Sequence, residues 1–136
     1  MPLEKLYATY ASLGPKTAPK EYSCMEVQNL EHRHKLLKEN TIVCVDLYAN
    51  WCEPCKGCAP QFAALAEQYN NPGRCMLIKE DVDLELTRDF QISGIPAFIF
   101  YINGRLYKEN GVPVSVTGGD VNQVRRILEK IMGSLN

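Results

Sequence analysis

The run of residues 41–48, TIVCVDLY, limits the possible folds of this chain more than any other segment. It is rich in β-branched residues and does not alternate between apolar and polar side chains, so it predicts a strand that is buried on both faces. An amphipathic helix predicted over Cys52–Tyr69 follows after a short turn. A doubly buried strand that leads directly into a helix favours an α/β fold with parallel strands.

Further strands and helices are predicted on both sides of this unit. On the N-terminal side, the pattern predicts a strand near Tyr22–Val27 and a polar helix over Asn29–Glu39. Pro113 limits the β-prone residues Val112–Val116 to an edge strand or an extended loop. The other predicted elements are a strand over Cys75–Val82, a short helix over Leu84–Phe90, a hairpin of Ala97–Ile102 and Arg105–Lys108 around Asn103-Gly104, and a helix over Val121–Met132 that Asp120 caps and Gly133 ends.

The N-terminal residues are predicted to lie outside this α/β domain. Leu3, Leu6, Tyr7 and Tyr10 recur at helical spacing, which predicts a short amphipathic helix. Prolines then mark a linker that ends near Tyr22. We therefore divide the chain into an N-terminal helix and linker, residues 1–22, and a compact domain, residues 23–136.

Charge and hydropathy argue against two classes of partner. Fifteen basic and sixteen acidic residues give a formal net charge of −1, which does not attract the chain to nucleic acid or to an anionic membrane. The longest apolar stretch, Ile95–Ile102, is interrupted by Pro96 and is too short to span a membrane, and residues 1–23 lack the apolar core of a secretory signal. We expect a cytoplasmic monomer that binds neither nucleic acid nor membranes.

Three of the six cysteines, Cys52, Cys55 and Cys58, follow one another at three-residue spacing. Such a cluster, in a chain with enough apolar residues for a core, indicates thiol chemistry rather than a disulfide framework. Cys52 lies at the predicted start of a helix, where unpaired N–H groups and the helix dipole stabilise a thiolate. Cys55 lies one turn later, and Pro54 suits the first turn. We predict that Cys52 is the attacking nucleophile and Cys55 the resolving cysteine.

Asp46 is a further candidate for chemistry because it interrupts the buried strand. An ionised carboxylate is costly in such a place unless it is paired, so we expect its pKa to be raised. A carboxyl group of this kind could accept the proton of the Cys55 thiol, directly or through one water molecule. The alternative is an aspartate that caps a loop at the end of the strand.

The residues around the cysteine pair resemble those of the thioredoxin family. The resemblance rests on residues 45–56, VDLYANWCEPCK, and on Gly94-Ile95-Pro96-Ala97-Phe98 further along the chain. A single C-x-x-C motif is weak support, but Trp51 before it, Pro54 within it and the aspartate in the preceding strand make the joint match specific. The resemblance implies a thioredoxin fold, with a mixed sheet of about five strands flanked by helices.

The resemblance also implies an activity. The chain would be a protein-disulfide reductase that acts through a Cys52–Cys55 dithiol and a mixed disulfide, with no cofactor and no metal. Its partners would be protein disulfides and an upstream reductase. The implied site residues are the proton acceptor Asp46, the cis proline Pro96, the tuning lysines Lys56 and Lys79, and the substrate-contacting residues Trp51, Glu53, Pro54, Ile95 and Gly118, where Gly119 fits nearly as well as Gly118.

Two residues depart from the commonest thioredoxin motif. Glu53 stands where glycine is most common, and its carboxylate would disfavour the neighbouring thiolate and make the pair more reducing, unless it is only a solvated residue that suits a first turn. Cys58 extends the motif to C-x-x-C-x-x-C, but Phe62 stands where an iron–sulfur pattern needs a fourth cysteine. A metal site would need a distant ligand such as Cys75 or His34; otherwise Cys58 is a buried apolar residue or an accessory thiol.

Other functions compete with the reductase. The same motif serves disulfide oxidases and isomerases, because the direction of exchange depends on the reduction potential. Ile95 before Pro96 resembles the reducing members of the family. A metal or iron–sulfur protein would contain bound zinc or iron, and a non-catalytic adaptor would keep its partner after Cys52→Ser. The remaining cysteines are expected to be inert strand residues: Cys24, Cys44 and Cys75.

Overall fold

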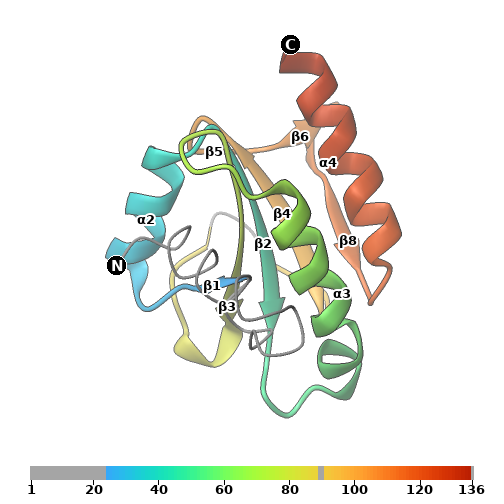
Figure 1. Cartoon of the computed structure of the whole chain (residues 1–136). Coiled ribbons are helices and arrows are strands. Elements are labelled where there is room, and N and C mark those ends of the chain that lie inside the picture. The colour runs from blue at the N-terminus through green and yellow to red at the C-terminus, as the bar shows by residue number, and fades with distance from the viewer. Residues whose placement is uncertain (1–23, 89–90, 136) are drawn as a thin grey trace, which may run out of the picture.

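A six-stranded sheet with helices on both faces forms the core of the computed structural model, which describes residues 24–88 and 91–135 (Figure 1). The expected N-terminal helix and linker lie outside these residues. The strands of the sheet are β1 (Met25–Glu26), β2 (Ile42–Tyr48), β3 (Cys75–Asp81), β4 (Ala97–Ile102), β5 (Arg105–Leu106) and β8 (Ser115–Thr117).

The strand β2 lies in the middle of the sheet. The strand order is β1-β3-β2-β4-β5, and β8 also pairs with β4. The pairs β1–β3 and β2–β3 are parallel, whereas β4 is antiparallel to β2, β5 and β8. Asp46 on β2 lies opposite Lys79 on β3 and Phe98 on β4. The sheet is therefore mixed and flanked by helices, as the predicted fold class requires.

Both faces of β2 are buried, as its sequence predicts. The helix α2 (Leu30–Glu39) covers one face and packs Leu36 and Leu37 against the odd-numbered residues of β2. The helices α3 (Glu53–Tyr69) and α4 (Val121–Leu135) cover the other face, where the even-numbered residues lie (Figure 1). Because side chains alternate along a strand, Asp46 lies on the face covered by α3.

Side-chain caps fix where the helices begin. Asn29 accepts a hydrogen bond from the His32 N–H at 2.7 Å, and Asp120 accepts one from the Gln123 N–H at 3.1 Å, which confirms the predicted cap of α4. The prediction that Gly133 ends α4 is wrong. Glycine in the last turn of a helix costs only about 1 kcal/mol relative to alanine, so the helix continues to Leu135. Within residues 24–88 and 91–135, no helix has the length and apolar character needed to cross a membrane.

The short helix predicted over Leu84–Phe90 does not form in the part of that segment that the structure describes. A single 3-10 turn, η2 (Val82–Leu84), ends at Glu85, whose φ of 56° is left-handed. The carbonyl of Thr87 accepts a hydrogen bond from the Arg33 guanidinium. This contact links the backbone at Thr87 to α2.

The segment between β5 and β8 forms a second hairpin. The strands β6 (Lys108–Glu109) and β7 (Val112–Pro113) pair antiparallel across Asn110-Gly111, whose φ values are 55° and 78°. Asn-Gly at positive φ is the usual signal for a tight hairpin turn. The predicted strand Arg105–Lys108 is therefore split after Leu106, and the predicted segment Val112–Val116 is divided between β7 and β8.

Candidate active site

The two predicted cysteines lie where β2 leads into α3, and they form a disulfide with their Cα atoms 5.3 Å apart. Cys52 is the N-cap residue of α3, and its sulfur accepts a hydrogen bond from the Cys55 N–H at 3.2 Å. This N–H group and the helix dipole favour negative charge on the Cys52 sulfur. The two cysteines are almost equally buried, 5% and 4% exposed, so it is the position at the helix end that favours Cys52 as the attacking thiol.

A loop that precedes β4 packs against the disulfide. The Ile95–Pro96 peptide bond is cis, and Ile95 packs against the cluster that Ala49, Cys52 and Cys55 form. The carbonyl of Pro96 accepts a hydrogen bond from the Gly118 N–H at 2.8 Å. Gly118 has a φ of 97°, which favours glycine, whereas Gly119 lies against α3, where an added Cβ would come within 3.3 Å of the Cys58 Cβ. Gly118 is thus the glycine beside Pro96.

Two exposed side chains stand beside the disulfide. Trp51 is 67% exposed, and its Nε1 donates a hydrogen bond to the Asp83 Oδ2 at 3.0 Å. Glu53 is also exposed, and its Oε1 lies 3.1 Å from the Nζ of Lys56. The lysine therefore offsets part of the negative charge that Glu53 places beside Cys52.

Removing the Glu53 carboxylate tests whether it acts on Cys52. We expect Glu53→Gly and Glu53→Gln both to lower the pH midpoint for alkylation of Cys52, by roughly a few tenths of a unit at low salt, because the interaction is between exposed groups. The measurement is the rate of iodoacetamide alkylation of the reduced protein against pH, at low and high salt. Unchanged midpoints would mean that Glu53 is only a solvated first-turn residue.

Asp46 lies on the face of β2 that α3 covers, with only 4% of its surface exposed. Its Oδ1 has no hydrogen-bond partner among the described residues. Burial raises the pKa of Asp46 to about 7, with Lys79 acting to lower it and Glu26 to raise it. Near neutral pH the carboxyl group is therefore poised to take up or release a proton. An aspartate that caps a loop accepts hydrogen bonds from backbone N–H groups, and the Oδ1 of Asp46 accepts none from the described residues.

A cavity of about 300 Å³ joins Asp46 to both predicted tuning lysines. Its side chains come from β2, β3, α3 and the residue just before β1: Cys24, Asp46, Lys56, Ala59, Pro60, Phe62, Ala63 and Lys79. Sequence reasoning missed Cys24 at this cavity, and it missed Glu26 and Tyr48, which contact Lys79. The parallel register of β1 on β3 places Glu26 beside Lys79, and the hydrophobic pattern of the strands does not set that register.

The other four cysteines are free and buried: Cys24, Cys44, Cys58 and Cys75. Burial raises the pKa of Cys75 to about 11, and burial together with Asp46 raises the pKa of Cys58 to about 11. Burial also raises the pKa of Cys24 and of Cys44. All four are therefore thiols at neutral pH. In the described part of the chain, no three His, Cys, Asp or Glu side chains gather in a way that could hold a metal ion.

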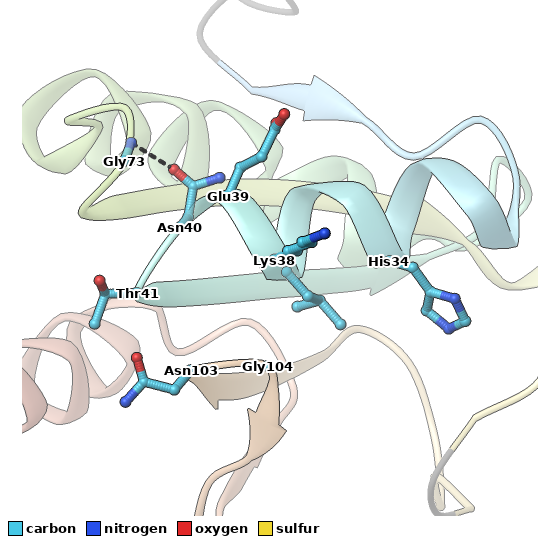
Figure 2. Close-up of a pocket in the computed structure, with 9 residues that line it drawn as sticks. His34, Lys38, Glu39, Asn40, Thr41, Gly73, Asn103 and Gly104 are labelled. Carbon is cyan, nitrogen blue, oxygen red and sulfur yellow. Dashed lines mark hydrogen bonds between the residues drawn. The ribbon is translucent and has the colours of Figure 1, made fainter.

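A separate cleft of about 470 Å³ lies at the opposite end of β2 (Figure 2). There the Asn40 Oδ1 accepts a hydrogen bond from the Gly73 N–H at 2.8 Å. The cleft adjoins the start of β2 at Ile42, whereas the cysteines follow its end at Tyr48, about 20 Å further on at the usual rise of a strand. It is therefore not part of the candidate active site. Its lining residues are His34, Leu37, Lys38, Glu39, Asn40, Thr41, Gly73, Asn103 and Gly104.

Comparison with known proteins gives one consistent family. The family model for thioredoxin matches residues 23–123. A thioredoxin of Neurospora crassa is 37% identical over 102 residues, which cover 74% of this chain and 79% of that protein. The crystal structure of Schistosoma mansoni thioredoxin has a TM-score of 0.64 at 32% identity and covers 79% of this chain and 95% of that chain. The structure of mitochondrial thioredoxin 3 of Saccharomyces cerevisiae has a TM-score of 0.68 at 23% identity, and the match covers 82% of this chain and 99% of that chain. This match shows that the two chains share a fold.

Proposed function

The chain belongs to the thioredoxin family and is a thiol–disulfide oxidoreductase, and we propose that it works as a protein-disulfide reductase. Members of this family act through a cysteine disulfide without a cofactor. The observation that carries the proposal is the Cys52–Cys55 pair at the start of α3, together with a buried carboxyl group of raised pKa, Asp46, on the face of β2 that α3 covers.

In the first step, the Cys52 thiolate attacks one sulfur of a substrate disulfide. A bond forms between Cys52 and that sulfur, the substrate S–S bond breaks, and the second substrate sulfur leaves as a thiolate. The Cys55 N–H that points at the Cys52 sulfur at 3.2 Å supports this assignment, because it stabilises the thiolate before the attack.

In the second step, Cys55 resolves the mixed disulfide. The Asp46 carboxylate takes the proton of the Cys55 thiol, directly or through one water molecule, and the Cys55 thiolate attacks the Cys52 sulfur. The mixed disulfide breaks and releases the other substrate sulfur as a thiolate that is then protonated. Two electrons have passed to the substrate, and the enzyme holds the Cys52–Cys55 disulfide. A separate reductase must return two electrons before the next turnover.

The surface around the disulfide would receive the substrate chain. We assign this contact to the side chains that lie beside the cysteines or next to the cis peptide bond: Trp51, Glu53, Pro54, Ile95, Pro96 and Gly118. The exposure of Trp51, 67%, supports the assignment, since a large aromatic side chain left in solvent is typical of an interaction site. Lys56 and Lys79 are proposed to tune Asp46, because both line its cavity.

The reduction potential of the Cys52–Cys55 couple tests the direction of the reaction. Equilibration with a dithiol buffer, followed by alkylation and mass analysis, gives the fraction of oxidised protein. A potential near that of thioredoxin, about −270 mV, would support a reductase, whereas one above about −200 mV would support an oxidase or isomerase. If the two cysteines never pair in solution, both proposals fail.

Replacing Asp46 by asparagine tests the proposed proton acceptor. We expect Asp46→Asn to slow the resolving step about a hundredfold at neutral pH, the lower end of the usual contribution of a general base. In the unchanged protein this step should become faster as the pH rises through about 7, since only the ionised carboxylate accepts a proton. The measurement is single-turnover decay of the mixed disulfide against pH. An unaltered rate in the variant would remove Asp46 from the mechanism.

The cellular setting is also a proposal. We propose a cytoplasmic monomer in electron transport between an upstream reductase and protein disulfides. Four buried free cysteines support a reducing compartment, and a formal net charge of −1 supports protein partners over nucleic acid or membranes. We assign the catalytic unit to residues 23–136, with residues 1–22 outside it; the family match, which begins at residue 23, supports this boundary.

A further inference from the structure

Lys79 lies between two carboxylates that belong to its two neighbouring strands. The parallel register pairs it with Glu26 on β1 and with Asp46 on β2. Partners across adjacent strands lie on the same face of a sheet, so the three side chains form one row over the face covered by α3. The ammonium group can therefore approach either the half-buried carboxylate of Glu26 at the edge or the buried one of Asp46 in the centre.

The observed contacts of Lys79 are on the outer side of this row. Its Nζ lies 3.9 Å from the Oε1 of Glu26 and 5.4 Å from the ring centroid of Tyr48. The hydroxyl group of Tyr48 donates a hydrogen bond to the Oε2 of the same Glu26. Tyr48 thus orients the carboxylate with its hydroxyl and receives the ammonium on its ring. Among the described residues, the Oδ1 of Asp46 has no hydrogen-bond partner.

We propose that Glu26 and Tyr48 are positioning residues that hold the Lys79 ammonium at the edge of the sheet, so that Asp46 stays free of a direct ion pair and accepts the Cys55 proton. The inference rests on the proposed role of Asp46 as proton acceptor and extends it to residues on β1 and at the end of β2.

The charges around Asp46 support the proposal that Lys79 pairs with Glu26 and not with Asp46. A cation in direct contact typically lowers the pKa of a carboxyl group by about 1–3 units, which would make Asp46 a weak base at neutral pH. With Lys79 turned toward Glu26, the pKa of Asp46 is raised to about 7. The other titratable groups near Asp46 are three thiols and one lysine: Cys24 just before β1, Cys44 on β2, and Lys56 and Cys58 on α3.

Titration of Asp46 in the oxidised protein measures the proposed effect directly. The midpoint comes from the NMR shift of the Asp46 carboxyl carbon against pH. We expect Glu26→Gln to lower the midpoint by about one pH unit, because the ammonium is released toward Asp46. Tyr48→Phe, which keeps the ring and removes the hydroxyl group, should lower it by less. In a Lys79→Gln background, Glu26→Gln should lose most of its effect, because there is no ammonium left to release.

The second hairpin provides a matched control. Glu109 accepts a hydrogen bond from the Tyr107 hydroxyl at 2.8 Å and pairs with the Lys130 Nζ at 2.6 Å, so it has the same kinds of partner as Glu26. It does not line the cavity of Asp46. Glu109→Gln should therefore leave the Asp46 midpoint unchanged.

The outcomes separate this inference from the function on which it rests. Unchanged Asp46 midpoints in Glu26→Gln and Tyr48→Phe would overturn the positioning role. An equally large shift for Glu26→Gln in the Lys79→Gln background would also overturn it, because the shift would then come from direct repulsion between the Glu26 and Asp46 carboxylates. The proposed acceptor role is tested separately by Asp46→Asn. If that variant resolves mixed disulfides at the normal rate, the acceptor role fails even where the titration shifts appear as expected.

Discussion

Replacing Cys55 by serine should convert this protein from a catalyst into a trap for its substrates. The variant keeps the proposed attacking thiol, Cys52, at the start of α3, so we expect it still to form a mixed disulfide with a protein substrate. A serine hydroxyl cannot displace a thiolate from the Cys52 sulfur at neutral pH, so the mixed disulfide should persist until an external thiol is added. Turnover with insulin as the substrate should fall to the uncatalysed rate.

Two matched variants make this prediction specific. Cys52→Ser removes the nucleophile, and it should abolish turnover without leaving any mixed disulfide. Cys58 is a buried free cysteine one turn further along α3. Cys58→Ser should therefore keep turnover close to that of the unchanged protein. The measurements are insulin reduction and non-reducing electrophoresis with mass analysis of any adduct. Trapping by Cys52→Ser instead of Cys55→Ser would reverse the assigned roles, and failure of Cys58→Ser alone would give the third cysteine a part in the reaction.

Local sequence predicts the central unit of this fold well. The strand at residues 41–48, the turn and the helix that begins with the cysteine motif depend on β-branching, helix capping and amphipathic spacing, which are all read within a few residues. The raised pKa of Asp46 also follows from its sequence neighbours, because they bury it. Local sequence is therefore enough to predict the cysteine pair and its proposed proton acceptor.

Two parts of the fold depend on information that local patterns do not carry. The sequence predicts a helix over Leu84–Phe90, but in the described residues 84–88 the 3-10 turn ends at Glu85 with a left-handed φ of 56°, and Thr87 contacts Arg33, more than fifty residues away in the chain. The row of Glu26, Lys79 and Asp46 depends on the register of three strands, which the hydrophobic pattern of each strand does not set. The second hairpin is different, because its Asn110-Gly111 turn is a local signal that sequence reasoning overlooked.

A buried cluster of charges joins α2, β3 and the segment after η2. Glu80 is fully buried on β3, and the Nη1 of Arg33 lies 3.0 Å from both of its carboxylate oxygens. The Nη2 of Arg88 lies 3.3 Å from its Oε2. Arg33 itself is only 5% exposed. One carboxylate therefore compensates two guanidinium groups that are shielded from solvent, and the same cluster holds the backbone at Thr87.

Removing the charge of Glu80 should be the most destabilising polar substitution in the described domain. Glu80→Gln keeps the volume of the side chain, but leaves two shielded guanidinium groups without a counter-charge. We expect the free energy of unfolding to fall by about 3–5 kcal/mol, the usual cost of breaking a buried pair on one side. The melting temperature should fall by at least about 10 °C. Urea and thermal unfolding of the oxidised protein measure both quantities.

Removing the whole cluster tests whether Glu80→Gln destabilises the protein because it leaves the two guanidinium groups without a counter-charge. Removing one charge of a buried ion pair leaves the other charge uncompensated, whereas replacing all the charged residues by apolar residues of similar volume is often neutral or stabilising. The triple variant Arg33→Leu, Glu80→Leu, Arg88→Met should therefore be more stable than Glu80→Gln alone. Glu109→Gln, which breaks an ion pair on the surface, should be indistinguishable from the unchanged protein. If the triple variant is instead the least stable, the cluster contributes net stability, and its geometry outweighs the cost of burying three charges.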